Sequence, residues 1–281
     1  MTCVLIANYW FLAYSHYMVR KRWKNIVQAV VCLLIITAQV GAKMEVPVLK
    51  ICVDNGDWRP FVYIKNEKVT GLHIDTIEAA LKEMGIDFKL IPAPWKRCLK
   101  GTEKGTFDAI ATASYNEERA VYMRYPHDAS NLKSEFRVGQ VQYNIIVHHS
   151  SDFEYTDELG YIPQPTRVPR DYSIGKDLKG MGFAIDDSSI NDQQNLKRLV
   201  REKTGSVIAL PYLVSWANQQ DGYAGQIKLI KKPIKSKSYF LVFSKSGQVD
   251  TSLAQSIWKK IQNVRDNTQV KKLPPIDVLE N

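Results

Sequence analysis

Short apolar runs alternate with amphipathic stretches in the N-terminal half of this chain, and this order restricts the fold more than composition does. The apolar runs at 48–53, 88–91 and 107–111 have the length and residue types of buried strands. The stretch 73–84 repeats apolar residues at three- and four-residue spacing, typical of one helix face, and 95–104 is predicted as a second helix. A glycine follows each stretch, where a helix is expected to end. This strand–helix–strand–helix–strand order predicts a parallel sheet with helices packed on it.

A second α/β unit is predicted after residue 140, because the first unit is too short to account for the whole chain. Residues 125–137 show no clear period and are predicted to connect the two units. The chain closes with an amphipathic helix near 251–265. The other predicted elements of the second unit are strands at 142–147, 183–185, 207–210, 227–230 and 239–243, and helices at 173–180, 189–203 and through Trp216.

The first 42 residues have the pattern of a targeting segment. A cluster of Arg and Lys at 19–24 precedes an apolar stretch at 26–37, and the small residues Gly41 and Ala42 follow it. This order is typical of a secretory signal peptide, and the apolar stretch is short for a membrane span. We therefore predict a signal peptide over residues 1–42, with Met18 as an alternative start. An uncleaved N-terminal anchor is the competing interpretation. The mature chain would begin near residue 43 in the periplasm, an oxidising compartment.

The charge of the chain argues against one class of partner. The 281 residues are 45% hydrophobic and 24% charged, as in ordinary globular proteins, and the net charge is +9. The predicted signal peptide holds Arg20, Lys21, Arg22 and Lys24 and no acid, so nine less four leaves +5 on the mature chain. No dense run of Lys and Arg remains. This pattern disfavours nucleic acid as a partner and supports a weak preference for anionic ligands.

Two cysteines remain after the predicted signal peptide, Cys52 and Cys98. An even pair in an exported protein predicts one disulfide. Two buried thiols are the alternative, because Cys52 lies in an apolar strand. The disulfide would close a long loop, for which chain entropy gives a stabilisation of roughly 4 kcal/mol. No Cys or His spacing matches a zinc site, so we expect neither a metal nor a cofactor.

The stretch 107–119 joins a predicted strand to hydroxyl groups and an arginine. Thr112 and Ser114 follow the apolar residues, and Arg119 comes five residues after Ser114. Arginine offers a rigid fork of donors and a turn offers backbone N–H groups, so this stretch predicts a site for a carboxylate. The alternative is that Arg119 is a surface residue in a helical turn capped by Asn116 and paired with a neighbouring glutamate.

Several of these segments together resemble a known family. The chain resembles the bacterial extracellular solute-binding proteins of family 3, which include amino-acid-binding components of ABC transporters. The resemblance is specific over residues 48–125 and looser from residue 140 onward, where it rests on 168–173 and on the strand–helix order. The segments that carry it are 58–61 (WRPF), 69–75 (VTGLHID), 94–98 (PWKRC), 105–109 (GTFDA) and Ser114 with Arg119.

The resemblance implies a fold and a division of the chain. The family fold is α/β and periplasmic-binding-protein-like (type II), with two lobes joined by two crossing strands and a ligand cleft between the lobes. For this chain it implies one lobe from residues 43–139 and 247–281 and a second lobe from residues 140–246. The final helix would then return to the first lobe, which agrees with its amphipathic pattern.

The resemblance also implies roles for residues of the first lobe. Ser114 and Arg119 stand where the family grips the carboxylate of the ligand, and Thr112 would add a second hydroxyl or backbone contact. Trp58 corresponds to an aromatic residue that stacks on the ligand, although packing in the core is the commoner role of tryptophan. Asn55 stands where the family often has a polar contact.

The facing lobe departs from the family pattern. Tyr172 and Ser173 precede and open the helix predicted at 173–180, where N–H groups and a hydroxyl form an anion site. Asp171 adds a negative charge beside them. Family members that bind amino acids usually carry an aspartate for the ligand's ammonium where this chain has Pro211 and Tyr212. A buried ammonium without a counter-charge is costly, so the sequence does not decide whether the ligand has an amino group.

These expectations define a function and its competitors. We expect an exported, monomeric solute-binding protein that captures a small carboxylate-bearing molecule, an amino acid or a related compound. It would deliver this molecule to an ABC-type permease or to a sensor. No catalytic residues are predicted, because no nucleophile–base pair is present. The alternatives are an exported enzyme on the same scaffold, such as a dehydratase acting on a cyclic carboxylate, and a sensory or partner-binding module without a free solute.

Overall fold

The computed structural model of the protein describes residues 48–155 and 161–267, all within one compact unit, Pro47–Asn281. The signal peptide predicted at 1–42 lies outside these described residues. Within them, no helix has the length and the apolar character that crossing a membrane requires. The fold is α/β, and its helices and strands gather at the two ends of a pair of long strands.

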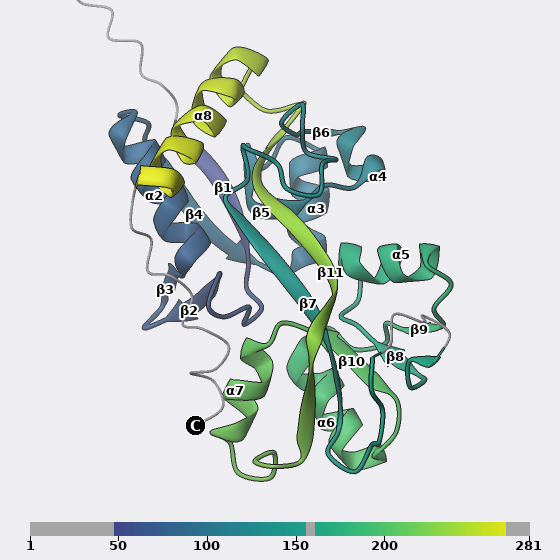
Figure 1. Ribbon diagram of the computed structural model, residues 1–281. Helices are drawn as coiled ribbons and strands as arrows, with labels where there is room; N and C mark the ends of the chain where they lie inside the picture. The colour runs from purple at the N-terminus through teal and green to yellow at the C-terminus, as the bar shows by residue number, and fades with distance from the viewer. Residues whose placement is uncertain (1–47, 156–160, 268–281) are drawn as a thin grey trace, which may run out of the picture. The chain divides into compact units, whose positions relative to one another are not determined.

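A parallel three-stranded sheet forms the centre of the first group of elements, which we call lobe 1 (Figure 1). Its elements are β1 (Leu49–Asp54), β2 (Tyr63–Lys65), β3 (Lys68–Thr70), α2 (Leu72–Glu83), β4 (Phe88–Ala93), α3 (Trp95–Glu103), β5 (Ala109–Ser114), α4 (Glu117–Ala120), β6 (Met123–Arg124) and α8 (Thr251–Asn267). β1 lies between β4 and β5, with α2 and α3 as connections, so the predicted strand–helix–strand–helix–strand order is confirmed. α8 comes from the end of the chain and packs against α2.

The second group of elements, lobe 2, lies at the opposite end of the long strands (Figure 1). Its elements are β8 (Thr166–Arg167), α5 (Ser173–Gly180), β9 (Ile185–Asp186), α6 (Asp192–Glu202), β10 (Ser206–Ala209) and α7 (Tyr212–Asn218). β8 runs parallel to both β9 and β10, and α6 packs against β10. Lobe 2 is therefore a second α/β unit, as the sequence predicted.

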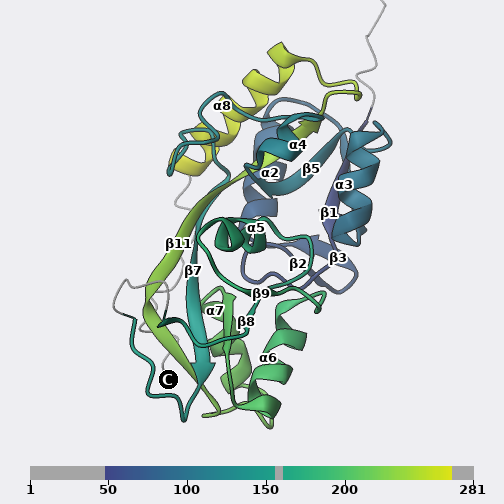
Figure 2. The same ribbon diagram turned by 90° about the vertical axis from the view of Figure 1, so that its right-hand side faces the viewer.

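Two long antiparallel strands, β7 (Gly139–His148) and β11 (Ile227–Ser244), run from one lobe to the other. β11 pairs with β5 and β6 in lobe 1, and β7 pairs with β10 in lobe 2, so one continuous sheet passes through both lobes. Figures 1 and 2 show the two strands side by side between the lobes from both directions. The predicted two-lobed fold with two crossing strands is confirmed.

β11 differs from its prediction. The sequence predicted separate strands at 227–230 and 239–243, and the structure has one strand over Ile227–Ser244. The intervening residues are rich in lysine and serine and include Pro233, so they carry no apolar pattern. They remain extended because they pair with β7, with the register shifting on either side of Pro233. Strand pairing decides the conformation here, whereas local pattern does not.

β5 also differs, and the difference matters for the site. The predicted strand was 107–111, but β5 covers Ala109–Ser114. Pairing with β11 extends it, because Tyr239 lies opposite Ser114 and Phe240 lies opposite Ala113. Thr112 and Ser114 therefore stand on the strand itself rather than in a turn after it.

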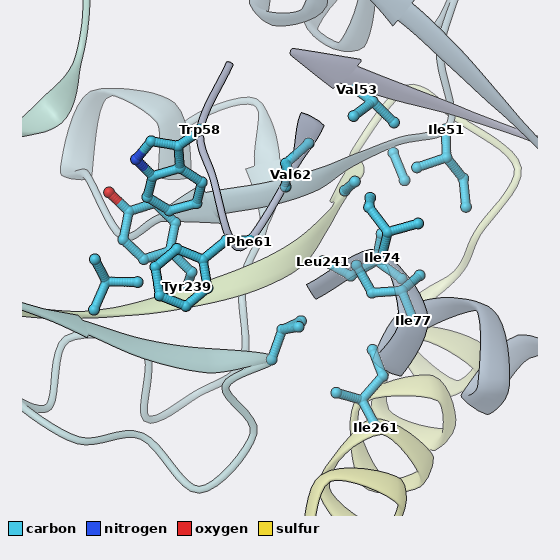
Figure 3. Close-up of a cluster of buried hydrophobic side chains, with 14 of the residues drawn as sticks. Ile51, Val53, Trp58, Phe61, Val62, Ile74, Ile77, Tyr239, Leu241 and Ile261 are labelled. Atoms are coloured by element: carbon cyan, nitrogen blue, oxygen red, sulfur yellow. The ribbon is translucent and has the colours of Figure 1, made fainter. Parts of the chain in front are cut away.

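The core of lobe 1 fixes the position of β1, β5 and β11 (Figure 3). Ile74 and Ile77 on α2 point toward Ile51 on β1 and Leu241 on β11, and Ile261 on α8 closes the cluster. Each of these five side chains is at most 1% exposed. Full burial of such a side chain contributes about 1.5–3 kcal/mol relative to exposure, so the ends of these strands are held firmly.

Cys52 and Cys98 form a disulfide, as predicted, with their Cα atoms 5.4 Å apart. Cys52 lies in the central strand β1 and Cys98 lies in α3, and neither is exposed. The bond therefore joins the sheet to the helix that follows β4.

Gly71 is expected to be intolerant of substitution. Its φ is +123°, and a Cβ atom there would lie 2.3 Å from the carbonyl oxygen of Phe61. Strained backbone costs about 1–3 kcal/mol, and this overlap adds to it, so we expect Gly71→Ala to lower the free energy of unfolding by about 3 kcal/mol. Urea unfolding measures this.

Gly85 provides the matched control, because its φ is +66° but no atom would lie within 4 Å of an added Cβ. Gly85→Ala should therefore cost only the left-handed conformation, about 1 kcal/mol. Equal losses for the two variants would show that the overlap with Phe61 has no effect.

Candidate functional site

A cavity lies where lobe 1, lobe 2 and β11 meet. Its empty space is about 410 Å³, of which about 40 Å³ admits the centres of water-sized molecules. That is room for roughly three waters, so the protein's own side chains approach one another closely here. The cavity is lined by Asp54, Trp58, Val62, Trp95, Thr112, Ala113, Ser114 and Arg119 from lobe 1, by Tyr172 and Ser173 from lobe 2, and by Tyr239 from β11.

Arg119 is the buried cation of this cavity. It lies in α4, whose cap Asn116 accepts a hydrogen bond from the Arg119 backbone N–H, so the helical turn of the alternative interpretation is present. The residue is only 7% exposed, and its guanidinium donates to the backbone carbonyl of Asp171 at 3.0 Å and lies 5.0 Å from the Trp95 ring centre.

The alternative of a surface ion pair does not hold for Arg119. Among residues 48–155 and 161–267, no ion pair includes it, and the neighbouring Glu118 pairs with Lys176 instead. A guanidinium that is withdrawn from water and lacks a carboxylate retains strong donor capacity, and a carboxylate is the partner that fits its geometry best.

Ser114 brings the two lobes into direct contact. Its hydroxyl lies 2.5 Å from the Ser173 hydroxyl, and the residue is 1% exposed. The Ser114 carbonyl accepts from the hydroxyl of Tyr125, which fixes the end of β5. Thr112 lies two residues earlier on the same strand, so its side chain points to the same side and lines the cavity as well.

The wall from lobe 2 is the turn into α5. Tyr172 is the residue before the first turn of this helix, and its hydroxyl donates to the Asp54 carboxylate across the cavity at 2.7 Å. Asp171 has a φ of +62°, and its exposed side chain does not line the cavity. Its backbone carbonyl faces lobe 1 and accepts from both Arg119 and the Trp95 indole. Asp171 therefore presents its backbone carbonyl to lobe 1, and not the negative charge of its side chain.

Lys237 supplies a second cation near Arg119. It lies on β11, is 8% exposed, and donates to the Ser173 hydroxyl at 2.8 Å and to the Asp177 carboxylate at 2.5 Å. Burial lowers the pKa of Lys237, and Asp177 opposes this shift. Its sequence neighbours are polar and give no apolar period, so sequence reasoning had no signal for it.

Trp58 belongs to the buried hydrophobic cluster of the core (Figure 3) and also lines the cavity. It is 9% exposed and packs against Tyr239 at a ring-centre distance of 4.7 Å and against Phe61 at 5.2 Å. The two interpretations of this residue are therefore compatible, because one part of the indole fills the core while another borders the cavity.

Asp54 occupies the place expected for Asn55. Asn55 is exposed and does not line the cavity, whereas Asp54, the last residue of β1, does. Burial raises the pKa of Asp54, against the lowering effect of the Tyr172 hydroxyl and the Gly56 N–H. Asn55 was expected from the family resemblance alone, whereas the residue that lines the cavity is Asp54, the acid at the end of the strand.

A second cavity borders the first across Trp58, which lines both. Tyr212, the residue that stands where the family has its ammonium-binding aspartate, lines this second cavity. Asp192, the first residue of α6, also lines it, and burial raises the pKa of Asp192 to about 7. Sequence reasoning missed Asp192, because an acid at a helix start is common for structural reasons alone.

Asp192→Asn is expected to remove a pH-dependent loss of stability. Burial raises the pKa of Asp192 from 3.8 to about 7, so the folded protein holds this proton more tightly than the unfolded chain. The stability that the protonated carboxyl provides is complete below pH 3.8 and is lost as the pH rises to about 7. The full shift of the pKa corresponds to roughly 4 kcal/mol in the free energy of unfolding. Because the residue is partly exposed, we expect the wild type to lose about 2 kcal/mol relative to Asp192→Asn.

The measurement is the free energy of unfolding of both proteins in urea at several pH values. The wild type should lose stability relative to Asp192→Asn between about pH 4 and pH 7. Asp221→Asn, at an exposed position of lobe 2, serves as the charge-matched control and should follow the wild type. A constant difference between wild type and Asp192→Asn would contradict the burial of this carboxyl.

Metal binding finds no support in the described ranges 48–155 and 161–267, where no three His, Cys, Asp or Glu side chains are grouped as a metal ion requires. The chemistry of the cavity is instead that of hydrogen bonding and ion pairing. Arg119, Ser114, Thr112 and Ser173 offer donors, and Trp58 and Tyr172 offer aromatic surface.

Similarity to solved structures supports the fold. The arginine-, lysine-, histidine-binding protein ArtJ from Geobacillus stearothermophilus is 17% identical, with 84% of this chain and 100% of that chain covered at a TM-score of 0.62. A histidine kinase sensor domain with similarity to periplasmic binding proteins is 15% identical, with 79% and 92% covered at 0.62. The periplasmic domain of BvgS from B. pertussis is 13% identical, with 80% and 42% covered at 0.62. No curated protein matches the sequence.

The family comparison agrees with the resemblance described above. The family model for bacterial extracellular solute-binding proteins, family 3, matches residues 49–273, which is most of the chain. The matched structures are binding proteins and sensor domains rather than enzymes. An extracellular family and a formed disulfide both indicate export. This chain belongs to the bacterial extracellular solute-binding proteins of family 3.

Proposed function

We propose that this protein captures a small carboxylate-bearing solute, an amino acid or a related compound, and holds its carboxylate on Arg119 and Ser114. The observation that carries this proposal is the Arg119 guanidinium, which is buried in the cavity and bonds a backbone carbonyl of the facing lobe. A carboxylate would satisfy two of its donors at once and carries a full opposite charge, whereas a carbonyl carries a partial one.

Other cavity residues complete this clamp. The Thr112 and Ser173 hydroxyls lie on opposite walls, where each would donate to the solute. Trp58 and Tyr172 would cover its apolar part. Asp54 takes the place of Asn55 in this arrangement. It would supply the acid for an ammonium group of the solute, because Pro211 and Tyr212 carry no acid.

Solute binding is proposed to stabilise the closed arrangement of the lobes. We assign residues 43–139 and 247–281 to lobe 1 and residues 140–246 to lobe 2, with β7 and β11 as the hinge. A solute that touches both walls binds the closed form more tightly than the open form, and this difference shifts the equilibrium.

Export and delivery complete the proposal. Residues 1–42 would direct the chain to the periplasm, where it acts as a monomer and passes the solute to an ABC-type importer. A second candidate is a ligand-sensing role, which the similarity to a kinase sensor domain and to the BvgS periplasmic domain supports. The solute-binding step is common to both. An enzyme such as a dehydratase is not favoured, because the family consists of binding proteins.

A thermal-shift screen of amino acids, peptides and organic acids tests the proposal. We expect at least one carboxylate compound to raise the melting temperature of the purified protein and to be recovered chemically unchanged. A compound that stabilises the protein equally as its methyl ester would contradict the carboxylate clamp. Turnover of the compound would contradict a binding role.

A further inference from the structure

A residue that lines the cavity beyond Trp58 has a buried carboxylate oxygen with no partner among the described residues. Asp192 begins α6 and lines this cavity, and its Oδ1 has less than 1 Å² of exposed surface and no hydrogen bond among the described residues. Buried polar groups are almost always hydrogen-bonded, so an orphaned carboxylate oxygen calls for a functional explanation. We propose that this second cavity is a subsite for a positively charged group of the solute, an amine or a guanidinium, which pairs with Asp192.

The protein's own cation in this cavity is engaged elsewhere. Arg59 is a lining residue, but its Nε donates to Asp57 at 3.0 Å and its guanidinium lies 4.6 Å from the centre of the Tyr63 ring. Among the described residues, Arg59 forms an ion pair with Asp57 and none with Asp192. The Asp192 carboxylate therefore keeps its capacity for a cation that comes from outside the protein.

The other walls of the cavity favour a cation as well. Trp58 from lobe 1 and Tyr212 and Trp216 from lobe 2 present aromatic surface to it. The faces of such rings attract ammonium and guanidinium groups, most strongly where water is excluded. The empty space of this cavity is about 300 Å³, which is enough for an ammonium or a guanidinium group.

The position of the subsite defines the class of solute. Trp58 borders both cavities, and Asp192 adds to the effect of burial and of Asp54 in raising the pKa of Tyr172, which lines the first cavity. A solute whose carboxylate lies on Arg119 would therefore place a distal group past Trp58 toward Asp192. This inference rests on the proposed function, and it narrows the solute to one with a cationic group distant from its carboxylate.

Matched pairs of small molecules test this on the purified protein by isothermal titration calorimetry. Lysine and norleucine share the carboxylate end and differ in the distal charge, and so do arginine and citrulline. We expect the wild type to bind a basic member at least about tenfold more tightly than its neutral partner. Asp192→Asn should reduce that preference to less than about twofold, while Asp221→Asn should keep it.

The outcomes separate the subsite from the carboxylate clamp. Equal binding of basic and neutral partners, lost in Arg119→Ala, would overturn the subsite and leave the proposed function intact. Binding that survives Arg119→Ala would overturn the proposed function. A charge preference that persists in Asp192→Asn, or no binding by lysine or arginine, would also overturn the subsite. Because Asp192→Asn is expected to be at least as stable as wild type at neutral pH, unfolding does not confuse the result.

Discussion

Replacing Arg119 with alanine is expected to weaken solute binding by at least about 100-fold. Removal of one partner from a buried, hydrogen-bonded charge pair costs roughly 3–5 kcal/mol, and each 1.4 kcal/mol is a factor of ten in affinity. The folded protein should survive the change, because Arg119 has no ion-pair partner among the described residues. Calorimetric titration with a solute found by the thermal-shift screen measures the loss.

Two further variants test the cause of that loss. Arg119→Lys keeps the charge but not the planar fork of donors, so its affinity should lie between wild type and Arg119→Ala. Lys176→Ala breaks an exposed ion pair with Glu118 across the same lobes, and exposed pairs contribute at most about 1 kcal/mol. If Arg119→Ala binds as tightly as Lys176→Ala, Arg119 is not the carboxylate clamp.

Removing the disulfide is expected to lower the free energy of unfolding by about 4 kcal/mol. Cys52 and Cys98 are 46 residues apart, and a closed loop of that length restricts the unfolded chain by about this amount. The variant Cys52→Ala/Cys98→Ala avoids leaving thiols in the buried site. Urea unfolding of the oxidised wild type and of the double variant gives the difference.

The reduced wild type serves as the control for this measurement. It should unfold at a urea concentration close to that of Cys52→Ala/Cys98→Ala, because both lack the same link between β1 and α3. If the double variant were as stable as the oxidised protein, the loop-closure explanation would be wrong.

Local patterns were sufficient to predict much of lobe 1. The spacing of Ile74 and Ile77 predicted α2, because one helix face must be apolar to cover a sheet. The hydroxyls and the arginine of 107–119 stand together in the sequence, so local sequence was enough to group Ser114 and Arg119, which line one cavity. Asn116 is also a cap that local sequence reveals.

The remaining parts of the site depend on contacts between distant segments. Tyr239 and Lys237 lie on β11, whose polar middle is extended only because it pairs with β7. Asp54 and Tyr172 are 118 residues apart and meet where the two lobes face each other. Asp192 resembles an ordinary helix-start residue in the sequence, and only its unpartnered oxygen in the folded chain distinguishes it. No local pattern encodes these relations.

The most direct test of the central claim is a crystal structure of the protein with its solute. We predict that the solute lies between the lobes, with its carboxylate oxygens within hydrogen-bonding distance of the Arg119 guanidinium and the Ser114 hydroxyl. The bond from Arg119 to the Asp171 carbonyl should then be replaced or shared. A solute bound elsewhere, with Arg119 still bonded to Asp171 alone, would contradict the account.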